Sequence, residues 1–132
     1  MTQDELLQLI DQAAAEGWTE LDLSGQGVTE LPPEIGKLTQ LETLILGKVE
    51  KWEYLDGKPT PQLSTNNLTE LPKAIANLTQ LRSINLSGNP LEALPDWLSK
   101  LQNLKEIWAV AINLTTIPEC IGELKNLTEL GL

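Results

Sequence analysis

The chain has 132 residues, of which 41% are hydrophobic, enough for one modest domain with its own core. Its formal net charge of −10 and its lack of any basic run argue against nucleic acid or an anionic membrane as a partner. With no histidine and a single cysteine, it can form neither a histidine-based triad nor an internal disulfide. The opening MTQDELLQLIDQ resembles neither a signal peptide nor a membrane span, so we expect a cytoplasmic protein.

Residues 1–17 are predicted to form one amphipathic helix. Thr2 and Glu5 have the spacing of a capping box, and Gly17 suits the position just past a helix end. The apolar residues of one helical face are Leu6, Leu9, Ile10, Ala13 and Ala14. Such a helix can close the open end of a stacked repeat structure.

From Trp18 onward the sequence repeats with a period of 23 residues. Blocks that begin at Trp18, Leu81 and Leu104 share the skeleton LxxLxLxxNxLxxLPxxIxxLxx. A block from Leu41 runs for 40 residues before the next one begins, and a partial block starts at Leu127. A period of this length indicates stacked supersecondary units, because one unit cannot bury its apolar edge alone.

Each block predicts a short strand followed by a helix-like turn. In LxxLxL the last two leucines, such as Leu21 and Leu23, point the same way from a strand. In LPxxIxxL the spacing becomes helical and places Leu31, Ile35 and Leu38 on one side. Stacked strands about 4.8 Å apart would align these leucines in continuous buried rows. The expected result is a parallel sheet on one side and loops or short helical turns on the other.

The asparagine of the skeleton follows the strand, where the chain turns and backbone groups lack partners. Asn66 and Asn89 occupy this structural position. A buried amide can satisfy both donors and acceptors of neighbouring turns. Gln26 replaces the asparagine in the first block, and Ile112 replaces it in the block from Leu104. We therefore expect a less regular turn around Ile112.

The second block contains an insertion of about 17 residues, at about 48–64. KVEKWEY alternates charged with apolar or aromatic residues, as a strand does. The Asp56-Gly57 pair is a strong tight-turn signal, and Pro59 and Pro61 restrict the returning segment to an edge. The insertion is therefore predicted to form a hairpin that stands beside the stack without breaking it.

Two interpretations of the insertion's aromatic residues remain open. Trp52 and Tyr54 could form a side wall that faces a partner, as insertions in repeat proteins often do. Alternatively, they could fold back on the repeats and cover strand edges.

The last block, LTELGL, stops within a predicted strand at Leu132. Its edge and its last leucines would be bare, so we expect the natural protein to continue. If it does not, the bare end at Leu130 and Leu132 could mediate self-association.

From Trp18 to Leu132, insertion apart, the sequence resembles leucine-rich repeat proteins. TELPPEIGKL and TELPKAIANL resemble the Leu-Pro class of bacterial and plant intracellular repeat proteins. The resemblance implies an α/β fold, a leucine-rich repeat solenoid that forms a right-handed superhelix. Its parallel sheet would line a concave surface, with 1–17 as an N-terminal helical cap and 18–132 as the repeats.

A narrower resemblance concerns TELDLSGQGVTELPPEIGKLTQLETLILG, preceded by a short helix and followed by an insertion before STNNLTELP. This arrangement is similar to the amino-terminal repeats of bacterial Roco (Roc-COR) proteins. In that family the repeats precede a Ras-like GTPase domain and a dimerising COR domain. The present sequence has no GxxxxGK[ST] phosphate loop, so GTP binding is assigned to none of its residues.

The residues expected to face outward from the strands are mostly small, polar or acidic. Ile45, Trp108 and Val110 are the exceptions, and an exposed tryptophan at a sheet centre is a typical interface anchor. Alternatively, the irregular stretch IWAVAINL could shift register and bury Trp108 as filler. The candidate partner-binding residues are Ile45, Trp52, Tyr54, Asn85, Glu106, Trp108 and Val110.

The sequence therefore predicts a non-catalytic protein–protein interaction module that binds a protein partner on its concave face and insertion. Cys120 has no histidine to activate it, and the acidic pair Glu20 and Asp22 has no supporting signal, so no catalytic, metal or cofactor site is assigned. The alternative function is a regulatory or sensing domain of a Roco-type GTPase or kinase-like enzyme whose catalytic part lies beyond residue 132.

Overall fold

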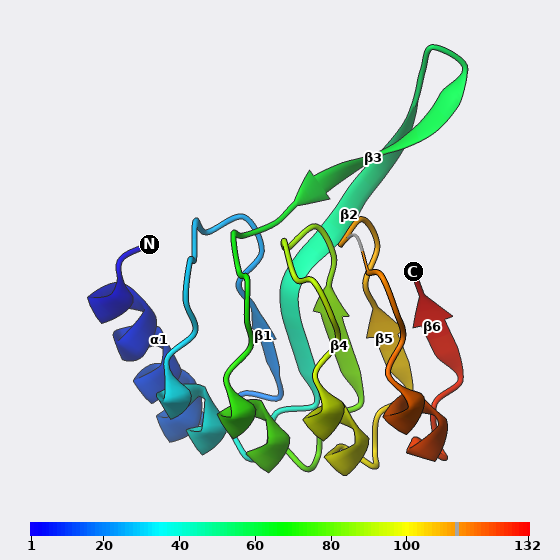
Figure 1. Cartoon of the computed structure of the whole chain (residues 1–132). Coiled ribbons are helices and arrows are strands. Elements are labelled where there is room, and N and C mark those ends of the chain that lie inside the picture. Colours follow the sequence, from blue (N-terminus) through cyan, green and yellow to red (C-terminus); the bar gives the residue numbers. More distant parts are fainter. Residues whose placement is uncertain (113) are drawn as a thin grey trace.

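Parallel strands form one face of the molecule and short helical turns form the other (Figure 1). The computed structural model describes residues 1–112 and 114–132. Its sheet has the order β1-β2-β4-β5-β6, and β3 pairs antiparallel with β2. The helices are α1 (Gln3–Glu16), η1 (Pro33–Lys37), η2 (Lys73–Asn77), η3 (Asp96–Lys100) and η4 (Glu119–Glu123). The strands are β1 (Glu20–Asp22), β2 (Thr43–Leu55), β3 (Lys58–Ser64), β4 (Ser83–Leu86), β5 (Glu106–Trp108) and β6 (Glu129–Gly131).

The register of the sheet aligns the leucine positions of successive blocks. Leu21 lies opposite Leu44, Leu44 opposite Ile84, and Ile84 opposite Ile107. These four side chains are buried in one continuous core. The predicted row of stacked leucines is therefore confirmed. Leu130 continues the row on β6, where it is 37% exposed.

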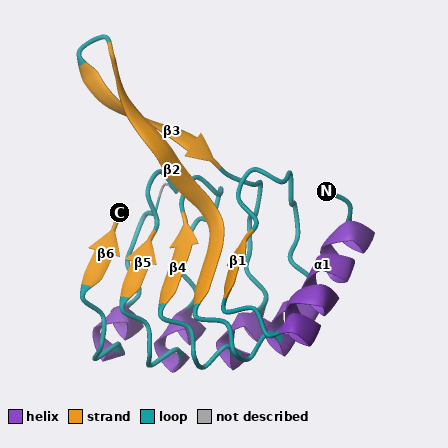
Figure 2. Cartoon of the chain, turned by 180° about the vertical axis from the view of Figure 1, so that it is seen from behind, coloured by secondary structure: helices purple, strands orange, loops and turns teal. Residues whose placement is uncertain are grey.

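Helix α1 covers the β1 end of the core (Figure 2). Thr2 and Glu5 form the predicted capping box, and Gly17 adopts the left-handed conformation that ends the helix. Leu6, Ile10 and Ala13 are buried against the first repeat. The helix thus shields apolar side chains that a bare terminal repeat would expose.

Each LPxxIxxL segment forms a five-residue 3-10 helix. The proline of the Leu-Pro pair stands just before the helix, with an extended backbone. A proline there needs no amide hydrogen, and its fixed φ suits an entry turn. The apolar residue at the centre of each turn is buried, namely Ile35, Ile75, Leu98 and Ile121.

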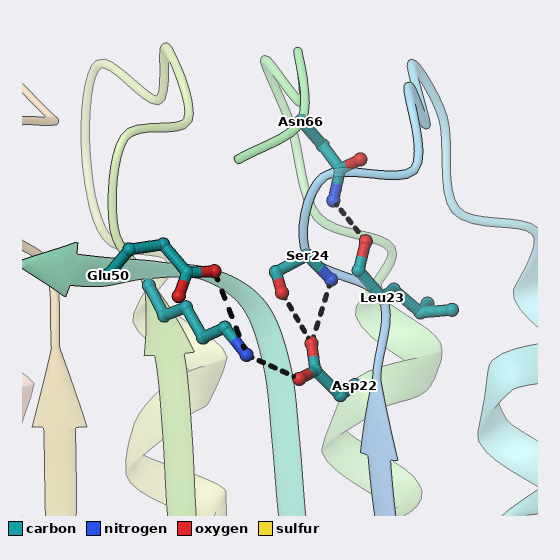
Figure 3. A network of polar contacts seen from close by, with 6 residues as sticks. Asp22, Leu23, Ser24, Glu50 and Asn66 are labelled. Atoms are coloured by element: carbon teal, nitrogen blue, oxygen red, sulfur yellow. Dashed lines mark hydrogen bonds and ion pairs between the residues drawn. The ribbon is translucent and has the colours of Figure 1, made fainter. Parts of the chain in front are cut away.

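The Asn66 side chain joins the turns of the first two blocks. Its Nδ2 donates to the carbonyl oxygens of Leu23, at 2.8 Å, and Leu46, at 2.9 Å. Its Oδ1 accepts from the backbone amides of Gln26, at 3.2 Å, and Val28, at 2.9 Å. The bond to Leu23 is visible in Figure 3. All four hydrogen-bonding positions of this buried amide are therefore used.

Asn89 has the equivalent role in the following block. Its Nδ2 donates to the carbonyl oxygens of Leu46 and Leu86, both at 3.1 Å, and its Oδ1 accepts from the amide of Leu68 at 3.2 Å. Leu46 thus receives a hydrogen bond from each of the two asparagines. The pair connects the turn before the insertion to the turns after it.

The turn after β5 lacks the residues that shape the other turns. Ala111 has φ 59°, at a position equivalent to Gly25 with φ 69° and Gly88 with φ 76°. This left-handed conformation costs an alanine about 1–2 kcal/mol more than a glycine. Ile112 is buried at the asparagine position. Asn113, which belongs to the turn expected to be less regular, lies outside the described residues.

Candidate functional site

Two rows of strand residues face away from the core on the strand side, which we call the sheet face. The first row contains Glu20, Thr43, Ser83, Glu106 and Glu129. The second row contains Asp22, Ile45, Asn85, Trp108 and Gly131. Because the strands are parallel and in register, these residues stand at the strand spacing of about 4.8 Å.

Trp108 lies on the sheet face, and β5 has not shifted register. Its strand neighbours are Asn85 on one side and Gly131 on the other. The partly exposed indole lies over Gly131, so closely that any Cβ at that glycine would collide with the ring. Its Nε1 donates to Oε2 of Glu106 at 3.4 Å. The hypothesis that Trp108 is filler brought inside by a register shift is therefore wrong.

The insertion forms a hairpin whose first strand is a direct continuation of a sheet strand. β2 pairs with β1 and β4 in its first half and with β3 in its second half. The turn lies at Asp56 and Gly57, which have φ 52° and 77°. Figures 1 and 2 both show the hairpin rising from the stack and leaning toward the β6 end.

A bulge gives the hairpin one apolar face. It lies between Val49 and Lys51 and adds one residue to β2. Val49 and Trp52 therefore point to the same side, and Tyr54 follows by strand alternation. The cross-strand partners on this face are Leu63, Pro61 and Pro59.

The aromatic side chains of the hairpin are exposed to solvent. Trp52 is 57% exposed and Tyr54 is 78% exposed. The hypothesis that they fold back to cover strand edges is wrong, because most of the surface of both side chains is exposed. Leu55, at 51%, is exposed beside them.

The hairpin base and the sheet face border an open hollow of about 230 Å³. It is lined by Lys48, Val49, Trp52, Asn85, Ser87, Trp108 and Val110. Four of the predicted partner-binding residues meet there: Trp52, Asn85, Trp108 and Val110. Ile45, Tyr54 and Glu106 lie outside the lining, although Glu106 contacts the Trp108 ring.

Lys48, Val49 and Ser87 also line the hollow, although the sequence did not indicate them as partner-binding residues. Ser87 is 1% exposed, and its Oγ accepts from the amide of Val110 at 3.1 Å. The amide of Gly88 donates in turn to the carbonyl of Val110 at 2.8 Å. These bonds fix the floor of the hollow. Strand alternation alone does not place Val49 and Trp52, three residues apart, on one side, because the bulge between Val49 and Lys51 shifts the alternation.

A polar network lies beside the hollow, on the β1 side. Asp22 accepts from the amide of Ser24 at 2.9 Å and from its hydroxyl at 2.6 Å (Figure 3). Lys48 Nζ lies 2.9 Å from Oδ2 of Asp22 and 4.0 Å from Oε1 of Glu50. The Lys48 ammonium is therefore held between two carboxylates.

This network shifts the protonation of both partners toward the charged form. Partial burial acts to raise the pKa of Asp22, but the hydrogen bonds from Ser24 and Lys48 outweigh it and hold that pKa below its ordinary value. The hydrogen bond to Asp22 and the charge of that carboxylate raise the pKa of Lys48. Both groups are ionised at neutral pH, so the pair persists there.

Groups that could support catalysis are sparse in the portion of the chain that the structure describes. No cluster of three or more His, Cys, Asp or Glu residues there could hold a metal ion. Cys120 lies on the turn side, in η4, where burial and the charges of Asp96 and Glu123 raise the pKa of its thiol. Among the described residues, no helix is long and apolar enough to cross a membrane.

The sequence of the repeats matches a known protein family. A model of the leucine-rich repeat region matches residues 20–132. The chain belongs to the leucine-rich repeat family. The family match, the parallel sheet and the N-terminal helix together confirm the predicted fold class, a leucine-rich repeat solenoid with a helical cap. Such solenoids commonly serve as protein-binding modules and are typically non-catalytic.

Solved leucine-rich repeat structures resemble the chain over nearly its whole length. It is 35% identical to a leucine-rich repeat protein of Leptospira interrogans, with a TM-score of 0.75 over 92% of the chain and 27% of that protein. It is 25% identical to the leucine-rich repeat domain of the type III effector XopL, with a TM-score of 0.73 over 98% of the chain and 41% of that structure.

Internalin C2 from Listeria monocytogenes shares the fold, with 22% identity and a TM-score of 0.66 over 92% of the chain and 50% of that structure. The chain thus spans between about a quarter and a half of these leucine-rich repeat structures. No curated protein sequence matches the chain significantly.

Proposed function

We propose that this leucine-rich repeat chain is a non-catalytic protein-binding module whose sheet face and hairpin contact the same partner. The observation that carries the proposal is that Trp52, from the insertion, and Trp108, from the repeats, line one hollow. Partly or fully exposed tryptophans surrounded by polar residues are typical of interface anchors. The proposed contact residues are Ile45, Trp52, Tyr54, Asn85, Glu106, Trp108 and Val110.

The proposed mechanism is recognition by a preorganised surface. The strands hold their side chains at fixed spacing, and hydrogen bonds fix the floor of the hollow through Ser87 and Val110. Little conformational entropy is then lost on binding, because most of the surface is already ordered. The net charge of −10 favours a basic or neutral partner, and association should slow as salt increases.

Replacing either tryptophan of the hollow is expected to reduce partner binding. Trp108→Ala and Trp52→Ala should each weaken binding of the captured partner by about tenfold or more, because both remove an aromatic anchor. The measurement is quantitative affinity capture from the source organism, followed by titration of the captured protein against each variant. Circular dichroism would first confirm that each variant is folded.

Trp97→Ala provides the matched control, since Trp97 lies in η3 on the turn side. Its affinity for the partner should equal that of the parent chain at a temperature where both are folded. Unchanged capture by both hollow variants, or equal losses in all three, would show that the chosen surface is wrong.

The alternative proposal is that the chain is a regulatory or sensing region of a cytoplasmic bacterial Roco-type protein. It rests on the Leu-Pro pattern of the repeats and on the position of the insertion, which resemble the amino-terminal repeats of that family. Sequencing the gene on either side of this segment tests it. A GxxxxGK[ST] phosphate loop followed by a COR domain would support it, and the lack of both would refute it.

Self-association of residues 1–132 is a further proposal for the isolated chain. β6 exposes Leu130 at 37%, and the neighbouring Leu132 is 56% exposed. An edge strand with exposed leucines favours pairing with a second copy. The mass measured by light scattering should rise with protein concentration, and Leu132→Lys should suppress the rise. A constant monomer mass would contradict the proposal.

A further inference from the structure

We infer that the hollow binds a cationic side chain, an arginine or lysine of an extended segment of the partner protein. The inference rests on the proposed function and adds the chemistry of the ligand. It is carried by two aromatic side chains that flank the hollow and by the excess of carboxylates on the face around it.

The aromatic side chains come from two directions. Trp52 enters from the hairpin and Trp108 from the sheet, and both line the hollow. A cation near the face of an indole is attracted by the ring's quadrupole, and arginine also stacks on such rings. The Trp108 ring is held in place by Gly131 beneath it and by Glu106 at its nitrogen. Its orientation is therefore set before any ligand arrives.

The sheet face carries an excess of negative charge. Glu20, Asp22, Glu106 and Glu129 all project from its two outward rows. Glu106 borders the hollow, because its Oε2 accepts from the Trp108 nitrogen at 3.4 Å. That oxygen also accepts from the Ser83 hydroxyl at 3.2 Å. The second carboxylate oxygen, Oε1, takes part in neither bond, so it can accept from a guanidinium or ammonium group.

Lys48 is the cation that could oppose this inference, since it also lines the hollow. Its ammonium is paired with Asp22 at 2.9 Å and lies 4.0 Å from Glu50. The single positive charge of Lys48 is therefore outweighed by the two carboxylates, and the net charge of this group of three side chains is negative. The Lys48 stem still offers apolar surface to the hollow.

The hairpin continues the contact surface beyond the hollow. Val49, Trp52 and Tyr54 share one face of the hairpin with Pro59 and Pro61. A peptide that inserts its basic side chain between the tryptophans can lay its neighbouring residues along this apolar strip. The expected ligand is therefore a basic residue flanked by an apolar or aromatic one.

Selection from a phage library of random twelve-residue peptides tests the inference. Peptides that bind the folded chain are expected to share an arginine or lysine, and synthetic versions should be titrated calorimetrically. Changing that arginine to citrulline, which keeps the shape and removes the charge, should weaken binding about tenfold or more. Trp52→Ala and Trp108→Ala should each weaken binding by a similar factor.

Two matched charge variants distinguish a local carboxylate from the net charge. Glu106→Gln should lower the affinity for the basic peptides about fivefold or more. Its neutral amide can still accept a hydrogen bond from Trp108, but it does not attract the cation. Glu123→Gln makes the same charge change on the exposed turn side and should leave the affinity unchanged. Equal losses in both variants would overturn the inference.

The remaining outcomes separate this inference from the proposed function. Peptides that depend on both tryptophans but share no basic residue would refute the cationic ligand and leave the binding surface supported. Peptides that bind both tryptophan variants as well as the parent chain, or a selection that enriches none, would refute the surface and the inference together.

Discussion

Asn66→Ala is expected to lower the free energy of unfolding by about 3 kcal/mol, because buried backbone groups left without partners are costly. The substitution removes hydrogen bonds to Leu23, Leu46, Gln26 and Val28. Leu46 keeps its bond from Asn89, so the main cost falls on the carbonyl of Leu23 and on the buried amide of Val28. Urea unfolding followed by circular dichroism measures the loss.

Asn67→Ala is the matched control for this prediction. Asn67 is the next residue and is exposed, so its substitution should change the free energy of unfolding by less than about 0.5 kcal/mol. A loss for Asn66→Ala no larger than that of the control would show that water replaces the amide without cost. The role of Asn66 in joining the turns around the insertion would then be wrong.

Gly47→Ala is expected to lower the free energy of unfolding by about 3 kcal/mol, because a methyl group forced into a packed backbone contact displaces its neighbours. Gly47 is buried, and a Cβ there would overlap the carbonyl oxygen of Ser87. Thr65 Oγ1, which donates to the same carbonyl at 3.0 Å, lies 3.1 Å from the added atom. Thermal or urea unfolding would measure the effect.

The same substitution should also weaken binding in the hollow. Ser87 belongs to its floor, and the strand that leads to Trp52 leaves the sheet at Gly47. Gly122→Ala is the control, since no atom lies within 4 Å of the added methyl group and the glycine does not require a positive φ. It should change the stability by less than about 0.5 kcal/mol. Equal effects of the two alanines would contradict the prediction.

The insertion is compatible with the stack because both of its ends are fixed to the repeats. Before it, Leu46 receives hydrogen bonds from Asn66 and Asn89. After it, the carbonyl of Thr65 accepts from Gly25 at 3.1 Å. The chain therefore leaves and re-enters the solenoid at almost the same place, and closing such a loop costs little. The hairpin can extend the binding surface without changing the repeats.

The hairpin turn could be predicted from the sequence, but the direction of its side chains could not. Asp56 and Gly57 supply the turn from local sequence, so the hairpin itself was predictable. The side to which Trp52 points was not, because it depends on a bulge between Val49 and Lys51. A bulge is set by the pairing of two strands and has no reliable signal in one of them.

For Trp108, the sequence allowed two alternatives: an exposed position on the sheet face, or burial after a shift in register. The loss of the expected leucine at Ala109 and of the asparagine at Ile112 suggested a disturbed block. The structure retains the register, since Ile107 and Ala109 are both buried and the β5 pairings continue. Packing of the stacked core outweighs the loss of one side chain and one amide, because a slip by one residue would turn the buried Ile107 and Ala109 to the outward face.

The sequence alone determined the solenoid, its capping helix, its leucine rows and the asparagine positions, because each follows from spacing within one repeat. Only the tertiary structure decided that Trp52 and Trp108 line one hollow and that Lys48 is paired with Asp22. These contacts join residues of different repeats and of the insertion. Their geometry depends on the bulge and on the direction in which the hairpin leaves the sheet, and neither is encoded in a local period.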